Sequence, residues 1–369
     1  MKIVIAPDSF KGSASSLEIS EWLENGISQV ELLNCEIIKV AIADGGEGSL
    51  DSVLSAGFIS HTFSVTGPVG NSVNARIGIN GDTALVELAE ASGLSQLPEK
   101  YLSPLIATSF GTGELILRAL DLGAKRVILA VGGSACTDAG AGALQALGAH
   151  LLNAEGDEIA FGGAALAHCT TINLENLDPR LSNTQFILAS DVDNPLLGPK
   201  GAAAIYAPQK GANASDVALL EAALMNFADI AGTKHVTTAG SGAAGGFGFM
   251  AYTFLNASHQ SGIDIFIELS QFESHCIGAD LVITGEGMYD SQSLSGKAPV
   301  GIYSVASSHN VPVVLVCGQA KLNSSVENAP KFSEIYSLAS FDLDISKCIS
   351  NPRPIVEKIG KVIAKELLK

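Results

Sequence analysis

The 369-residue sequence has few positive charges. Lys and Arg number 21 against 38 Asp and Glu, which gives a formal charge of −17 at pH 7. Binding to nucleic acid requires clustered basic residues that contact phosphates, and binding to anionic membranes has a similar requirement. We therefore expect neither nucleic acid nor membranes among the partners. An anionic substrate would have to be held locally, by a few lysines and backbone N–H groups.

Patterns typical of disulfide frameworks and metal sites are also missing. No two of the six cysteines form a C-x-x-C pair, and the seven histidines show no ligand spacing. Scattered cysteines are typical of free thiols in a reducing compartment. The apolar start of the chain is too short for a signal peptide, and the longest uncharged stretch, residues 235–263, is rich in glycine. We therefore predict no membrane span and a cytoplasmic location.

Apolar residues (47%) and glycine (39 residues) are abundant, which is enough for a sizeable core with many tight turns. Short runs rich in Val and Ile alternate with helical patterns, and this alternation predicts an α/β fold with a parallel sheet. The first helix is expected after a capping box, in which Ser15 precedes Glu18 by three residues. The predicted strands are 2–6, 36–43, 126–131, 185–189, 280–284, 312–317 and 334–338, and the further predicted helices are 112–122, 215–230, 298–308 and 355–368.

Residues 61–87 break this alternation. Three segments there alternate apolar and polar residues with a period of two, and Gly-Pro and Asn-Gly turns separate them. Such a pattern is typical of an antiparallel meander. We therefore expect two domains. Residues 1–60 plus 275–369 would form a Rossmann-like parallel-sheet domain, and residues 61–274 would form a mixed α/β domain inserted in the middle of the chain.

The first two predicted strands end in loops that combine glycine with charged residues. Ligands bind at the carboxyl ends of strands in open α/β sheets, so both loops are candidate sites. The first loop would meet an anionic group, and the second would accept hydrogen bonds from hydroxyls or hold a cation. The structural alternatives are an ordinary strand–helix turn and a helix cap. The candidate residues are Asp8, Ser9 and Lys11 in the first loop, and Asp44, Gly45, Gly46 and Glu47 in the second.

The strongest phosphate-binding pattern lies at residues 131–142, where a predicted buried strand runs into a Gly/Ser/Thr loop and then a helix. Glycine leaves backbone N–H groups unobstructed, and a helix N-terminus adds positive potential. The chain contains no G-x-x-x-x-G-K-[ST] sequence, so this is not a Walker A loop. Close packing of helix on strand is the structural alternative. The candidate residues are Gly132, Gly133, Ser134 and Asp138.

A pair of aspartates follows the fourth predicted strand. Asp191 and Asp193 are two residues apart, so an extended backbone would point both side chains the same way. Two convergent carboxylates suit Mg²⁺, or a general base beside a metal. An Asx turn before Pro195 is the alternative. Asn194 lies beside the pair, and Lys210 in a downstream loop supplies another positive charge.

Two more glycine-rich segments follow. Residues 240–245 match G-x-G-x-x-G after a weak predicted strand at 235–239, which raises the alternative of an NAD-dependent hydroxy-acid dehydrogenase. A glycine loop that approaches a ligand fits that context better. The loop after the strand at 280–284 mixes glycines, acids, hydroxyls and a lysine, with a long surface loop as the alternative. Its candidate residues are Glu286, Asp290 and Lys297.

Lysines, paired carboxylates and glycine loops together favour phosphoryl transfer to a small molecule. In such reactions the protein positions the groups and neutralises charge, and Mg²⁺ bridges the phosphates. The sequence offers no Cys–His or Ser–His arrangement for nucleophilic catalysis. A non-catalytic protein that binds small acids is a further alternative.

Several of these segments resemble the signatures of bacterial class I glycerate kinases. The resemblance implies ATP-dependent phosphorylation of D-glycerate with Mg²⁺, in a cleft between two domains of a monomer or homodimer. The 2-hydroxyl is the favoured acceptor, with the 3-hydroxyl left open. The loop at residues 135–140 departs from the family pattern at Cys136, Thr137 and Ala139. The similar segments run in order through the chain, at residues 6–12, 43–48, 191–198, 206–211, 240–249 and 284–297.

The resemblance gives the candidate residues roles. We expect Asp191 to act as general base and Asp193 to bind Mg²⁺, with the reverse assignment left open. Lys11, with Ser9 beside it, would bind the carboxylate of glycerate or a phosphate. The loop from Gly132 to Asp138 would contact phosphate oxygens. Glu286, Asp290 and Lys297 would line the ATP or the substrate side.

Overall fold

The computed structural model describes residues 1–31, 34–46, 48–97, 102–291, 293–295, 297–322 and 329–368. The chain divides into two compact units. Unit 1 comprises Met1–Asp44, Asp51–Gly57 and Ser261–Lys369, and unit 2 comprises Gly45–Leu50 and Phe58–Gln260. Residues 261–274, which the sequence pattern assigns to the inserted domain, cluster with unit 1. That the two units correspond to the two expected domains stays a prediction.

Unit 1 contains a five-stranded sheet in which every pairing is parallel, as the runs of Val and Ile predict. The order is β2-β1-β11-β12-β13, so the chain leaves β1 toward one edge and leaves β11 toward the other. The second strand is shorter than predicted, because residues 40–43 are buried without strand pairing. The strands are β1 (Lys2–Pro7), β2 (Glu36–Lys39), β11 (Leu281–Tyr289), β12 (Val313–Ala320) and β13 (Glu334–Ser337).

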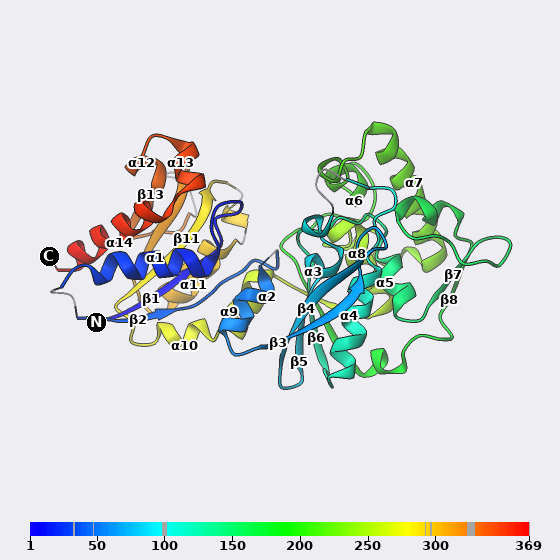
Figure 1. Cartoon of the computed structure of the whole chain (residues 1–369), viewed down its shortest axis with the longest axis horizontal. Helices are drawn as coiled ribbons and strands as arrows, with labels where there is room; N and C mark the ends of the chain where they lie inside the picture. The colour runs from blue at the N-terminus through cyan, green and yellow to red at the C-terminus, as the bar shows by residue number, and fades with distance from the viewer. Residues whose placement is uncertain are drawn as a thin grey trace. The chain divides into compact units, whose positions relative to one another are not determined.

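Helices cover both faces of this sheet. Ile3 and Ile5 of β1 join one apolar cluster and Val4 and Ala6 another, since alternate side chains of a strand point to opposite faces. Figure 1 shows the first helix (blue) and the last (red) side by side on the first face. That face carries α1 (Ser16–Ser28), α12 (Leu338–Phe341), α13 (Ile345–Ser350) and α14 (Arg353–Leu367), and the other carries α9 (Gly262–Leu269), α10 (Phe272–Cys276) and α11 (Ala298–Ser308).

The capping box that begins α1 is confirmed. The Ser15 side chain accepts a hydrogen bond from the Glu18 N–H, and the Glu18 side chain accepts one from the Ser15 N–H. Two donors that would lack an intrahelical partner are thereby satisfied.

Unit 2 contains a mixed sheet of order β10-β9-β6-β5-β4-β3. The antiparallel meander is confirmed, because β3 pairs with β4 and β4 with β5 in antiparallel register. Beyond it, β5 pairs with β6 in parallel, which joins the meander to an α/β arrangement. The strands are β3 (Ile59–Thr66), β4 (Ser72–Asn80), β5 (Thr83–Glu87), β6 (Arg126–Ala130), β9 (Gln185–Ala189) and β10 (Ser258–Gln260), with a separate hairpin of β7 (His150–Leu152) and β8 (Thr171–Asn173).

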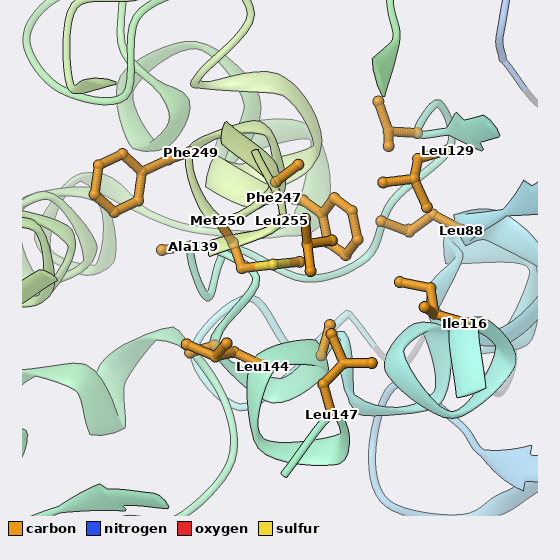
Figure 2. Close-up of a cluster of buried hydrophobic side chains, with 14 of the residues drawn as sticks. Leu88, Ile116, Leu129, Ala139, Leu144, Leu147, Phe247, Phe249, Met250 and Leu255 are labelled. Carbon is orange, nitrogen blue, oxygen red and sulfur yellow. The ribbon is translucent and has the colours of Figure 1, made fainter. Parts of the chain in front are cut away.

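Several helices of unit 2 enclose a large apolar core. Figure 2 shows Leu144 and Leu147 extending toward Met250 and Phe247, so α5 and α8 share this core. No helix in the part of the chain that the structure describes is long and apolar enough to cross a membrane. The remaining helices are α2 (Ser49–Ser55), α3 (Leu88–Ser92), α4 (Phe110–Asp121), α5 (Ala141–Ala146), α6 (Ala202–Tyr206), α7 (Ala214–Ala231) and α8 (Ala243–Phe254), with 3-10 turns at Leu94–Gln96, Gly163–His168, Pro179–Asn183, Pro208–Lys210, Thr233–His235 and Ser293–Ser295.

Candidate functional site

A cavity of about 300 Å³ lies in unit 1 at the carboxyl ends of β1, β11 and β12. β1 and β11 are neighbours whose connections lead to opposite edges of the sheet, and the Asp8 N–H donates to the Gly285 carbonyl across them at 2.8 Å. Ligands of open α/β sheets bind at such a switch point. Six candidate residues line the cavity: Asp8, Ser9, Lys11, Asp44, Glu286 and Lys297.

Lysines and carboxylates interleave in this cavity. Lys11 Nζ lies 2.7 Å from Asp44 Oδ2, although the Lys11 side chain is 66% exposed. Burial, and next the nearby Asp44, raise the pKa of Asp8 to about 7. The Asp8 carboxylate accepts a hydrogen bond from the Ser9 N–H at 2.7 Å. The loop after β1 is therefore an ordered turn with a charged rim.

Glu286 contributes a buried carboxylate from β11. Its side chain is only 7% exposed, and Lys297 Nζ lies 4.0 Å from its Oε2. Its Oε1 is buried and has no hydrogen-bond partner among the residues that the structure describes. Burial raises the pKa of Glu286 to about 7. Asp290, the other acid of this loop, is not among the cavity-lining residues; its N–H donates to Ser293 Oγ and shapes the turn.

In unit 2, the loop after β6 is held by backbone hydrogen bonds. The Gly132 N–H donates to the Gly45 carbonyl at 3.2 Å, and the Gly133 carbonyl accepts from the Leu94 N–H at 2.9 Å. The Gly45–Gly46 turn therefore lies against this loop, and Gly45 takes a positive φ of 80° that favours glycine. Glu47 lies outside the described residues.

Asp138 is completely buried and bonds to protein donors. One of its carboxylate oxygens accepts from the N–H and the hydroxyl of Ser109 at 2.8 and 2.9 Å. The same oxygen, Oδ2, accepts from the Gly142 N–H, and the other oxygen, Oδ1, accepts from the Gly140 N–H. These donors are the groups that a phosphate would need at the end of this loop. In this conformation the carboxylate of Asp138 already accepts the hydrogen bonds of these donors.

Lys210 is buried as well, at 1% exposure. Its ammonium donates to Ser134 Oγ at 2.8 Å and to the Cys136 carbonyl at 2.5 Å. Burial lowers the pKa of Lys210. The sequence pattern suggested a loop lysine that supplies another positive charge, whereas here the buried ammonium fixes the conformation of residues 134–136.

Asp191 and Asp193 follow β9, and both are exposed. Asn194 beside them is engaged in the fold, since its Nδ2 donates to the Lys200 carbonyl at 2.8 Å and its Oδ1 accepts from Tyr206 Oη at 2.5 Å. Burial, and next the negative charge of Asp193, raise the pKa of Tyr206. The segment that carries the two aspartates is thus anchored at Asn194.

Asp191 and Asp193 could supply part, but not all, of the ligands of a divalent ion. No group of three or more His, Cys, Asp or Glu residues that could hold a metal occurs within the described ranges. Two exposed carboxylates nevertheless suit Mg²⁺, which is usually bound through one or two carboxylates together with substrate phosphates and water. The residues present therefore fit an ion that arrives with a nucleotide, and do not form a closed protein cage.

The G-x-G-x-x-G segment does not have the context of a dinucleotide site. Residues 235–239 form no strand; a 3-10 turn and further turns lie there instead. Ala244, Gly245 and Gly246 all have positive φ. A Cβ on Gly245 would lie 2.2 Å from the Cys136 carbonyl oxygen. The glycines allow close packing on the loop after β6.

The chain is similar to known proteins along its whole length. The model of the glycerate kinase family matches residues 3–368. The chain belongs to the glycerate kinase family. It is 44% identical over 372 residues to a glycerate kinase from Bacillus subtilis strain 168, covering 99% of this chain and 97% of the relative. It is 45% identical over 326 residues to glycerate 2-kinase from Escherichia coli K12, covering 86% and 85%.

A solved structure extends the similarity to three dimensions. A crystal structure from Salmonella typhimurium LT2, assigned as glycerate kinase 2, superposes with a TM-score of 0.85 at 39% identity, covering 100% of this chain and 98% of the other. The α/β fold expected from the sequence is therefore confirmed. As a member of a kinase family, the chain is an enzyme.

Sequence reasoning missed two structural features near the candidate residues, one in each unit. Glu87, at the end of β5, is 3% exposed and accepts hydrogen bonds from the N–H groups of Gly48 and Leu50 at 3.0 and 2.8 Å. The cavity of unit 1 also has an apolar wall that includes Met288, Ile345 and Ile349. The signal for Glu87 was an acid at the end of a predicted strand. Nothing local in residues 345–349 indicates a binding site.

Proposed function

We propose that this enzyme transfers the terminal phosphoryl group of ATP to glycerate. Membership of the glycerate kinase family supports the substrate, and the E. coli relative named glycerate 2-kinase supports the 2-hydroxyl as acceptor. The five buried free cysteines and the one of intermediate burial favour a reducing compartment, in keeping with a cytoplasmic enzyme.

The exposed carboxylate pair after β9 is the observation that carries the proposal. Asp191 and Asp193 follow the carboxyl end of the parallel strand β9, on a segment that Asn194 anchors through its hydrogen bonds. Transfer to a hydroxyl requires a group that accepts the hydroxyl proton, and an anchored, solvent-accessible carboxylate can accept it. We assign this role to Asp191.

Asp193 would hold Mg²⁺ together with phosphate oxygens of the nucleotide. When bound, the ion neutralises charge that develops on the transferred group. Lys210 orients Ser134 and the Cys136 carbonyl from within the protein, so we assign it a positioning role instead of a contact with substrate.

Nothing favours the dehydrogenase alternative, since the glycine segment at residues 240–245 follows no strand and packs on protein. A non-catalytic acid-binding protein would not be expected to retain kinase-family similarity along the whole chain.

The test is ADP release from Mg-ATP, measured with and without D-glycerate, with phosphorus NMR of the product. We expect release only when glycerate is present, and the phosphorus coupling pattern of 2-phosphoglycerate. A folded sample that releases no ADP with glycerate and Mg²⁺ would refute the proposal. The coupling pattern of 3-phosphoglycerate would refute only the choice of hydroxyl.

A further inference from the structure

The cavity of unit 1 has an apolar wall that a small polar acid does not need. Ile345 and Ile349 lie one turn apart on α13 and therefore share a helix face. Both line the cavity, and they are 52% and 53% exposed. The Ile349 carbonyl accepts a hydrogen bond from Ser13 Oγ at 2.5 Å, which ties α13 to the loop after β1. Covering these side chains with a flat apolar group would remove them from water.

The same cavity presents an acceptor that lacks a donor. Glu286 lines the cavity, and its buried Oε1 has no hydrogen-bond partner among the described residues. The nearby Ser293 hydroxyl lowers the pKa of Glu286 but donates to the Met288 carbonyl at 3.3 Å. A buried acceptor without a partner is costly and requires an explanation, and a donor supplied by a bound molecule is one that fits a cavity-lining side chain. An O–H or N–H of a bound molecule would satisfy it.

The charges of the cavity argue against glycerate. Three carboxyl side chains line it, those of Asp8, Asp44 and Glu286, against the two lysines Lys11 and Lys297. Lys11 is already paired with Asp44. A free carboxylate beside these side chains would add a fourth acid to the set, whereas the nucleoside part of a nucleotide is neutral and carries hydroxyl donors. The charge of its phosphates would then fall to Lys11, Lys297 and the metal ion. The volume, about 300 Å³, lies within the range of about 300–1,000 Å³ common for small-molecule sites.

We infer that this cavity binds the nucleoside part of ATP, with the base on Ile345 and Ile349 and a ribose hydroxyl donating to Glu286. The inference deepens the proposed function, on which it rests, by assigning one of the two substrates to unit 1. The lysines at the cavity would then face the attached phosphates. Glycerate would bind elsewhere.

The test measures binding of ADP by calorimetry and the KM for glycerate in matched variants. Ile345→Ser and Ile349→Ser change exposed side chains, so both variants should fold. Each should raise the Kd for ADP about five- to tenfold through lost apolar contact, with little change in the KM for glycerate. Ile277→Ser is the control, because Ile277 is 63% exposed in the same unit and does not line the cavity.

The hydroxyl contact is tested with 2′-deoxy-ADP and 3′-deoxy-ADP. At pH 8.5, above the raised pKa of Glu286 of about 7, the wild type should bind one of them about 10- to 100-fold more weakly than ADP, as expected for a lost hydrogen bond to a charged group. Glu286→Ala should bind ADP and that analogue about equally. Glu286→Gln, which keeps the side-chain shape, should retain part of the discrimination.

The outcomes separate the two claims. If the isoleucine variants raise the KM for glycerate and leave ADP binding unchanged while turnover is otherwise normal, the nucleoside assignment is wrong and the proposed function stands. Equal binding of ADP and both deoxy analogues by the wild type would also overturn the contact with Glu286. If ADP binds with the expected pattern but glycerate elicits no turnover, the proposed function fails and the nucleoside site stands.

Discussion

Replacing Glu286 with Gln should stabilise unit 1, and only at neutral and alkaline pH. Burial raises the pKa of Glu286 from 4.5 to about 7, so the folded protein holds this proton more tightly than the unfolded chain does. Stability from such a group is fully present below pH 4.5 and is lost as the pH rises through 7. A shift of this size corresponds to about 3 kcal/mol at pH 8.5. Glutamine has nearly the same shape and carries no charge, so the variant avoids this loss.

The single tryptophan makes the measurement specific to unit 1. Trp22 lies in α1 and packs against the apolar cluster on one face of the parallel sheet. Urea titrations followed by its fluorescence should show Glu286→Gln more stable than the wild type by about 2–3 kcal/mol at pH 8.5, and by less than about 1 kcal/mol at pH 5. Removing the charge of Glu286 also lowers the raised pKa of Asp8, because Glu286 is the smallest of the causes that raise it, and this acts in the same stabilising direction.

Glu21→Gln is the matched control, because Glu21 is an exposed glutamate of the same unit. It should change stability little at either pH. A difference between Glu286→Gln and the wild type that does not vary with pH would refute the reasoning, and so would a less stable variant at pH 8.5.

Three further predictions follow from the contacts described above. Asp191→Asn should lower kcat by roughly 10²–10⁴ with an unchanged circular dichroism spectrum, and a kcat near that of the wild type would exclude Asp191 as the base. Lys210→Met should lower the free energy of unfolding by about 1–3 kcal/mol, because it leaves Ser134 Oγ and the Cys136 carbonyl without their buried donor; an unchanged urea midpoint would contradict the positioning role. Ser15→Ala should lower the free energy of unfolding by about 1 kcal/mol through loss of the helix cap, as measured by urea titration with Trp22 fluorescence. An unchanged free energy of unfolding would indicate that the cap is dispensable.

Elements that depend on local pattern were predictable from the sequence. The helix at Ala298–Ser308 has the bounds that its apolar period indicates, and Gln185–Ala189 is the strand expected there. The run at residues 36–43 was predicted too long, since β2 ends at Lys39. The Val40 N–H still donates to the Ile5 carbonyl of β1, but the Ile42 N–H donates to the side chain of Ser16 and not to a strand. Burial alone therefore does not distinguish a strand from a buried connection.

Features that depend on distant partners were not predictable. Lys210 looked like a loop lysine, and only the position of Ser134 and Cys136, more than 70 residues earlier, explains its burial. Ile345 and Ile349 carry no local mark of a site and reach the cavity because α13 packs beside the loop after β1. The candidate residues at strand ends were easier to find, since the carboxyl edge of a parallel sheet collects them.

The pairing of β1 with β11 has a consequence for synthesis of the chain. Ile3 lies opposite Leu281 in the sheet, so the first strand has no partner on that side until nearly 280 residues more have been made. All residues of unit 2 have been synthesised once the chain reaches Gln260. During translation we therefore expect the middle of the chain to fold first. Until β11 has been made, the N-terminal strand would expose an apolar edge that chaperones recognise.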